Sequence, residues 1–147
     1  VGRGASLPDG RLDGATLSHL MQAAQGLDCT LHRCFDLVPD PAAALEQAVT
    51  LGFSRVLTSG GALRAVDALP ALAALIAQAG DRIAILPGSG ITAANAARFT
   101  ALGARELHGS CSAAVPAPEA AAAMGFGPAT ERRTEAALVR ALRQAVH

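Results

Sequence analysis

Residues 40–61, DPAAALEQAVTLGFSRVLTSGG, contain one helix followed by one strand. Asp40 is suited to the N-cap position, Pro41 to the first helical turn and Gly52 to the end of a helix. Residues 54–58 are an apolar run too short for a helix, and they lead into a glycine turn, which predicts a strand. The stretch therefore predicts a helix–strand unit with a short connection.

The same pattern repeats along the chain, beginning with a helix that Asp13 caps and Gly26 ends. The other predicted elements are a strand over 29–35, a helical segment over 62–79 with a fresh helix at Pro70, a strand over 83–86, a helix from Thr92 to Gly103, a strand over 104–110, an irregular segment over 110–130 and a closing helix over 134–146 capped by Thr134. Val1 and Gly2 are interpreted as the tail of an earlier strand. The order is a helix and then four strand–helix units, whose short connections require parallel strands.

Two α/β architectures agree with this order: an open doubly wound sheet, or part of a (β/α)8 barrel. Strands such as RVLTS and IAILP are nearly continuous in apolar character, which is typical of strands buried on both faces. A complete barrel needs about 250 residues. With 147 residues, the chain holds about half of one.

The composition indicates a single domain with its own core, because 51% of the residues are hydrophobic and 16% are charged. The formal net charge of zero and the absence of Trp and Tyr argue against nucleic-acid binding. No apolar run is long enough for a membrane span. The three cysteines form no disulfide framework, so the predicted location is the cytoplasm.

Polar and glycine residues follow each predicted strand. They are Arg33 and Asp36 after the first, Thr58, Ser59, Gly60 and Gly61 after the second, Gly88, Ser89 and Gly90 after the third, and His108, Gly109 and Ser110 after the last. In either architecture, ligands bind where the strands end. The glycine turns expose N–H groups that suit an anion, and Arg33, Asp36 and His108 could orient a carboxylate and move a proton.

Each cluster also has a purely structural interpretation. Arg33 and Asp36 could be an ion pair that plugs the end of a barrel, the glycines could serve only their turns, and His108 could be structural. Cys34 and Cys111 are candidate thiolate ligands for Cu(I), with buried structural cysteine as the alternative. The chain has no Lys, which excludes a Schiff-base mechanism run by its own residues.

Three motifs in this order resemble the CutC family: TLHRCFDLVPDPAAALEQAVTLGFSRVLTSGG over 30–61, DRIAILPGSGI over 81–91 and ARELHGS over 104–110. The residues that match the family's shared polar positions are His32, Arg33, Asp36, Thr58, Ser59, Gly60, Gly61, Gly88, Gly90, His108 and Ser110. Two positions depart from the family pattern. Cys34 replaces the usual Ala, and Ser89 stands in the middle of a turn usually written PGGG, so Cys34 is no ligand common to the family.

The resemblance implies an α/β fold, the C-terminal half of a (β/α)8 TIM barrel, with residues 1–147 as a single domain. It implies a role in copper homeostasis, either through direct binding of copper ions or through an indirect effect on copper tolerance. The alternative function is a lyase- or isomerase-like barrel enzyme that acts on a small phosphorylated or carboxylated metabolite, with His32, Arg33, Asp36 and His108 as the candidate catalytic residues. Four strands cannot close a barrel. The predicted partner is therefore a second copy of the chain or a missing N-terminal half-barrel.

Overall fold

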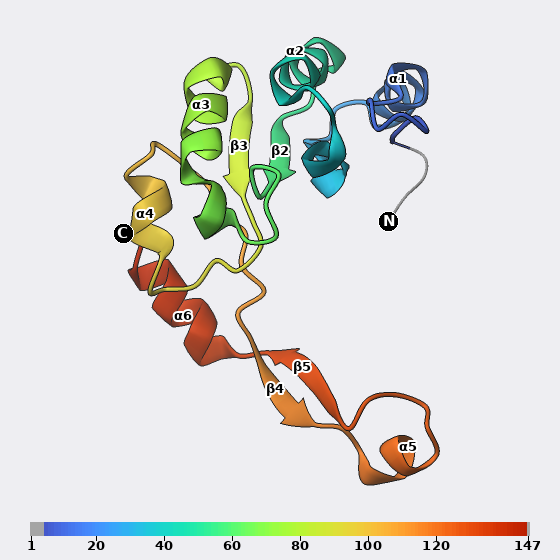
Figure 1. Ribbon diagram of the computed structural model, residues 1–147, viewed down its shortest axis with the longest axis vertical. Helices are drawn as coiled ribbons and strands as arrows, with labels where there is room; N and C mark the ends of the chain where they lie inside the picture. Colours follow the sequence, from blue (N-terminus) through green and yellow to red (C-terminus); the bar gives the residue numbers. More distant parts are fainter. Residues whose placement is uncertain (1–4, 147) are drawn as a thin grey trace.

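A computed structural model describes residues 5–146 of the chain (Figure 1), so the strand tail predicted at Val1 and Gly2 lies outside the described residues. The first two-thirds of the chain alternate helices and strands. In order these elements are α1 (Gly14–Ala23), β1 (Thr30–Leu31), the 3-10 helix η1 (Arg33–Leu37), α2 (Pro41–Leu51), β2 (Arg55–Thr58), the 3-10 helix η2 (Ala65–Ala68), α3 (Leu69–Ala79), β3 (Ala84–Pro87) and α4 (Ala96–Thr100). The predicted α/β class is confirmed.

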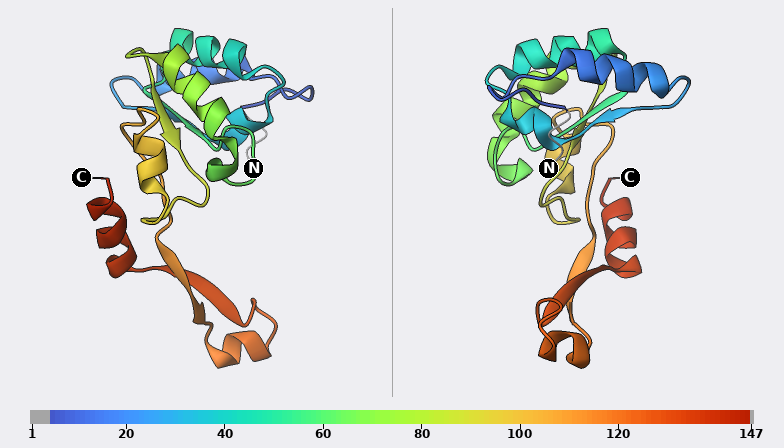
Figure 2. Two further views of the ribbon diagram at one scale, coloured as in Figure 1. Left: turned by 60° about the vertical axis from the view of Figure 1, so that its left-hand side comes forward. Right: turned by 90° about the vertical axis from the view of Figure 1, so that its right-hand side faces the viewer.

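The three strands form a parallel sheet in the order β1-β2-β3. Its register aligns Leu31 with Val56 and Val56 with Ile85. These three side chains are buried together with Leu45 of α2 and Leu72 of α3, so this face of the sheet carries the core. Figure 2 shows α1, α2 and α3 gathered along one side of the strands.

Alternate strand residues point away from these helices. In β2, Val56 and Thr58 are buried whereas Arg55 and Leu57 are only half-buried, and β3 repeats this alternation. One face of the sheet is therefore packed by helices, while the opposite face, which carries Leu57 and Leu86, stays partly open.

The helix boundaries follow local capping chemistry. Asp13 accepts a hydrogen bond from the amide of Thr16 at 3.0 Å, and Asp40 accepts one from the amide of Ala43 at 3.0 Å. Gly52 ends α2 in the left-handed conformation, with φ of 84°. Two predicted helices, which begin after Asp13 and after Asp40, are confirmed, and so is the new helix predicted at Pro70.

The predicted strand over 29–35 is wrong beyond Leu31. Nδ1 of His32 accepts a hydrogen bond from the amide of Cys34 at 3.0 Å and caps η1, so the chain coils at Arg33 instead of extending. The first helix also ends earlier than predicted, with Ala24 rather than Gly26 as its C-cap.

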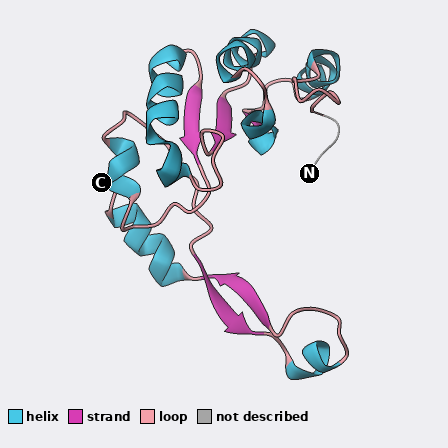
Figure 3. Cartoon of the chain, in the orientation of Figure 1, coloured by secondary structure: helices cyan, strands magenta, loops and turns pink. Residues whose placement is uncertain are grey.

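The predicted helix from Thr92 to Gly103 is shorter, because the side chain of Asn95 fixes a turn before α4. It accepts from the amide of Thr92 and donates to the carbonyl of Gly90, each at 2.9 Å. The strand predicted over 104–110 is reduced to a single parallel bridge between Gly88 and His108. Figure 3 shows this part of the chain as loop.

The segment predicted to be irregular, 110–130, is largely ordered. It contributes to a hairpin of β4 (Ser112–Pro116) and antiparallel β5 (Thr130–Thr134), joined through α5 (Glu119–Ala123). Thr134 belongs to β5 and does not cap the last helix, α6 (Ala136–Gln144), which follows Glu135. Figure 1 shows the hairpin projecting from the sheet and α6 lying beside its base.

Within residues 5–146, every helix is too short or too polar to cross a lipid bilayer.

Candidate functional site

The carboxylate of Asp36 is the centre of a dense hydrogen-bond network. η1 places Arg33 and Asp36 one turn apart, and Nε of Arg33 lies 2.6 Å from Oδ2 of Asp36. The side chain of Asp36 is only 7% exposed. Its Oδ1 also accepts a hydrogen bond from the hydroxyl of Thr58 at 2.5 Å, which ties the end of β2 to η1.

The glycine turn after β2 also binds this carboxylate. The amide nitrogens of Ser59 and Gly61 lie 2.9 and 3.2 Å from Oδ1 of Asp36, and the amide of Gly60 donates to the hydroxyl of Thr58. The turn was predicted to expose N–H groups to an anion. The anion that Ser59 and Gly61 contact is the protein's own aspartate, and Thr58 and Ser59 are fully buried around it.

These contacts determine the charge of Asp36. Burial raises its pKa, but the hydrogen bonds from Thr58, Arg33 and the Ser59 amide outweigh burial and hold the pKa below its usual value. The group is therefore ionised at neutral pH, with both oxygens already engaged. This arrangement suits a residue that positions Arg33 and the turn.

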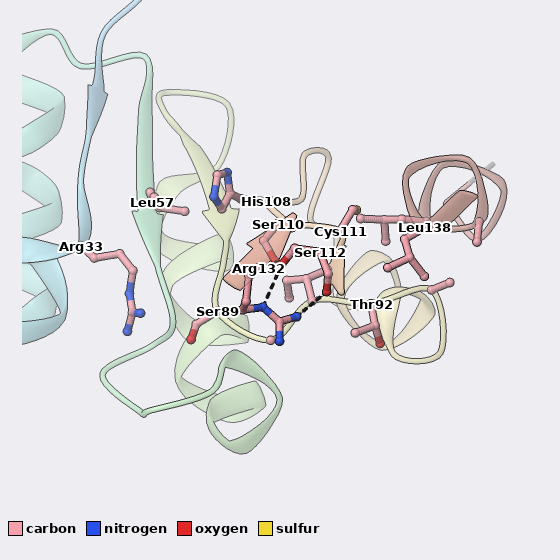
Figure 4. Close-up of a pocket in the computed structure, with 15 residues that line it drawn as sticks. Arg33, Leu57, Ser89, Thr92, His108, Ser110, Cys111, Ser112, Arg132 and Leu138 are labelled. Atoms are coloured by element: carbon pink, nitrogen blue, oxygen red, sulfur yellow. Dashed lines mark hydrogen bonds between the residues drawn. The ribbon is translucent and has the colours of Figure 1, made fainter. Parts of the chain in front are cut away.

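A cavity of about 410 Å³ opens beyond the ends of the strands (Figure 4). It is lined by Arg33, Leu57, Ser89, Gly90, Ile91, Thr92, Ala93, His108, Ser110, Cys111, Ser112, Arg132, Leu138, Ala141 and Leu142. Of the site residues predicted from the sequence, it brings together Arg33, Ser89, Gly90, His108, Ser110 and Cys111. His32, Cys34, Asp36, Gly88 and the 58–61 turn lie outside its lining.

Arg132 on β5 is a cavity residue that the sequence prediction missed. Its Nε donates to the hydroxyl of Ser112 at 2.9 Å, and its Nη2 donates to the carbonyl of the same residue. The structure shows no carboxylate paired with it among residues 5–146. The adjacent basic residues Arg132 and Arg133 could have indicated the cavity, but they border residues 110–130, which were predicted to be irregular.

The turn after β3 brings His108 close to the sheet. A Cβ on Gly88 would lie 2.6 Å from Cδ1 of Leu57 and 3.5 Å from Cβ of His108, so glycine permits this approach. Ser89 adopts a positive φ of 84°, and its hydroxyl donates to the carbonyl of Leu63. The exposed Arg64 packs over Gly90, with Nε 3.3 Å from the position of a Cβ there.

Cys34 and His32 do not fit a copper site, whereas Cys111 is half-buried at the cavity. Cys34 is 1% exposed, and burial raises the pKa of its thiol, which disfavours the thiolate that copper binds. Nδ1 of His32 is occupied by the amide of Cys34. In the part of the chain that the structure describes, no group of three or more His, Cys, Asp or Glu side chains could hold a metal ion.

Comparison with known proteins identifies the family. The sequence model of the CutC family matches residues 1–113. The chain belongs to the CutC family. A family protein CutC of Sinorhizobium medicae is 52% identical over 142 residues, which is 95% of this chain and 58% of that protein. A CutC family protein of Caulobacter vibrioides is 51% identical over 140 residues, which is 92% of this chain and 57% of that protein.

A solved structure supports the same relationship. The crystal structure of CutC from Streptococcus agalactiae, a protein named for copper homeostasis, matches with a TM-score of 0.68 and 31% identity. The match covers 72% of this chain and 53% of that chain. This CutC-family chain therefore spans less than two-thirds of the length of these relatives.

Proposed function

We propose that the chain contributes to copper homeostasis as the C-terminal half of a CutC-type (β/α)8 barrel. The name of the Streptococcus agalactiae relative supports a role in copper homeostasis. The parallel strand order β1-β2-β3, with helices on one face, supports the half-barrel architecture. In such a barrel the partly open sheet face would pack against the remaining strands, and pairing of two copies is the alternative.

Within that barrel, the proposed biochemical property is binding of a small anion at the rim formed by the strand ends. One observation carries this proposal. The cavity is lined by two guanidinium groups, Arg33 and Arg132, together with His108, and none of its described lining residues is Asp or Glu. Arginine is well suited to carboxylate and phosphate oxygens because of its planar donor geometry.

Both arginines are held in place while leaving donors for a ligand. Arg33 uses Nε on Asp36 and Nη2 on Ser59, and Arg132 uses Nε and Nη2 on Ser112. In residues 5–146 the Nη1 group of each has no hydrogen-bond acceptor. Figure 4 shows Arg33 at one edge of the lining residues, on the β1 side, and Arg132 in the middle of them.

Titration calorimetry with inorganic phosphate, at constant ionic strength, tests the anion site. We expect saturable binding that weakens by about tenfold in Arg132→Ala, because a charge-assisted contact is lost. Arg133→Ala is the matched control, since Arg133 is the next residue of β5, is bonded to Glu131 and does not line the cavity. Equal phosphate affinity in the wild type and Arg132→Ala, or an equal loss in Arg133→Ala, contradicts the proposal.

The catalytic roles predicted for His32, Arg33, Asp36 and His108 remain predictions, as does cytoplasmic location. Copper ligation by Cys34 and Cys111 also stays a prediction, and the burial of Cys34 argues against it.

A further inference from the structure

The cavity has one charged side and one apolar side. Arg33, Arg132 and His108 lie on the strand and hairpin side, whereas three residues of α6 form an opposite wall: Leu138, Ala141 and Leu142. Ile91 and Leu57 extend the apolar lining. In Figure 4, Leu138 enters from the α6 side, with Arg132 and Ser112 drawn between it and Arg33. An inorganic anion has no apolar group that could pack against this wall.

A close contact holds the apolar wall in place. A Cβ on Gly109 would lie 2.9 Å from Cδ2 of Leu142 and 3.2 Å from the carbonyl oxygen of Ile91, so α6 packs directly against the backbone after His108. Leu142 also packs against the hydrophobic core. The C-terminal half of α6 therefore packs against the rest of the protein through Leu142, while Leu138 remains 41% exposed at the cavity.

From this division we infer that the ligand is an amphiphilic anion: a phosphate or carboxylate head group attached to a small apolar body. The head group would contact Arg132, Arg33 would add positive charge from the β1 side, and the apolar body would cover Leu138 and its α6 neighbours. This inference rests on the proposed anion site and adds the class of molecule that fills it. The cavity volume of about 410 Å³ accommodates a ligand of this size.

Three probes separate the head group from the body: inorganic phosphate, phenyl phosphate and phenol. Burying a phenyl ring against the α6 wall should make phenyl phosphate bind about tenfold more tightly than inorganic phosphate. Phenol should bind at least tenfold more weakly than phenyl phosphate, because it lacks the charged head group. The probes are titrated into the 147-residue chain at constant ionic strength and pH.

Leu138→Ala tests the apolar wall, and Val139→Ala is its matched control. Both residues are similarly exposed on α6, at 41% and 44%, but Val139 does not line this cavity. We expect Leu138→Ala to reduce the preference for phenyl phosphate over phosphate by roughly threefold or more. Val139→Ala should keep the full preference, and thermal melts of both variants check that α6 is intact.

The possible results distinguish the two proposals. Phosphate binding that depends on Arg132, with no preference for phenyl phosphate, overturns the amphiphilic ligand but keeps the anion site. The amphiphilic ligand is also overturned if Leu138→Ala and Val139→Ala reduce the preference for phenyl phosphate over phosphate equally. Phosphate and phenyl phosphate binding that are both insensitive to Arg132→Ala overturn the anion site itself.

Discussion

The carboxylate of Asp36 accepts a hydrogen bond from the amide of Ser59, which lies 2.9 Å from Oδ1 and 3.2 Å from Oδ2. The two residues are 23 positions apart and follow neighbouring strands of the sheet. A buried internal anion therefore joins the ends of β1 and β2. The same aspartate holds Nε of Arg33, so the rim geometry of the cavity depends on it.

Replacing Asp36 by Asn should be strongly destabilising. The substitution removes the charge and replaces one of the two acceptor oxygens by an amide N–H₂ group, so that either Nε of Arg33 or the amide of Ser59 faces another donor. We expect the free energy of unfolding to fall by about 2–4 kcal/mol, measured by urea denaturation. Asp67→Asn, at an exposed position, is the control and should change it by less than about 0.5 kcal/mol. Similar losses in both variants contradict a special role for Asp36.

The network also predicts a pH dependence of stability. The pKa of Asp36 is lowered in the folded protein, so its contribution is fully present above the unfolded value of about 3.9 and is lost as the pH falls through the folded value. The unfolding free energy of the wild type should therefore decrease from about pH 5 downward. The difference between wild type and Asp36→Asn should shrink over the same window. A constant difference across that window would argue against ionisation of Asp36.

Alanine substitutions at Gly60 and Gly61 distinguish the destabilisation that comes from backbone strain from the destabilisation that comes from a steric clash. Both have positive φ, at 73° and 81°. A Cβ on Gly60 would lie 2.9 Å from Cβ of Ala68 at the start of α3, whereas a Cβ on Gly61 meets no atom within 4 Å among the described residues. Gly61→Ala should cost about 1 kcal/mol from backbone strain alone, and Gly60→Ala about 2–4 kcal/mol. Equal thermal destabilisation of the two variants would rule out the clash with α3.

The cysteines provide a test of copper ligation. Because Cys34 is buried with a raised thiol pKa, and because the described residues offer no three-donor cluster, we expect Cu(I) affinity to be unchanged in Cys34→Ala with Cys111→Ala. The measurement is competition with a chromophoric Cu(I) chelator under reducing conditions. Cys29→Ala is a control for nonspecific thiol binding. A drop of tenfold or more in the double variant alone would establish these thiols as ligands.

Local sequence determined the helix starts and the turn chemistry. Asp13 and Asp40 cap helices through amides only three residues away, and Gly52 ends α2 through its own backbone freedom. The sequence also located Arg33 and His108 on one rim, because the ends of parallel strands lie at the same edge of a sheet. These features depend on neighbours in the chain or on the regularity of the fold.

Other features appeared only when distant segments were brought together. The turn at 59–61 predicts an anion, but that Asp36 occupies it depends on the pairing of β1 with β2. Arg132 reaches the cavity because β5 pairs with β4 in a register that places it opposite Ala114, within a segment whose sequence lacks a clear strand pattern. Hydrogen-bond partners more than 20 residues apart are set by strand register and packing, which local propensity does not encode. The tertiary structure alone therefore decided which polar residues serve the fold and which line the cavity.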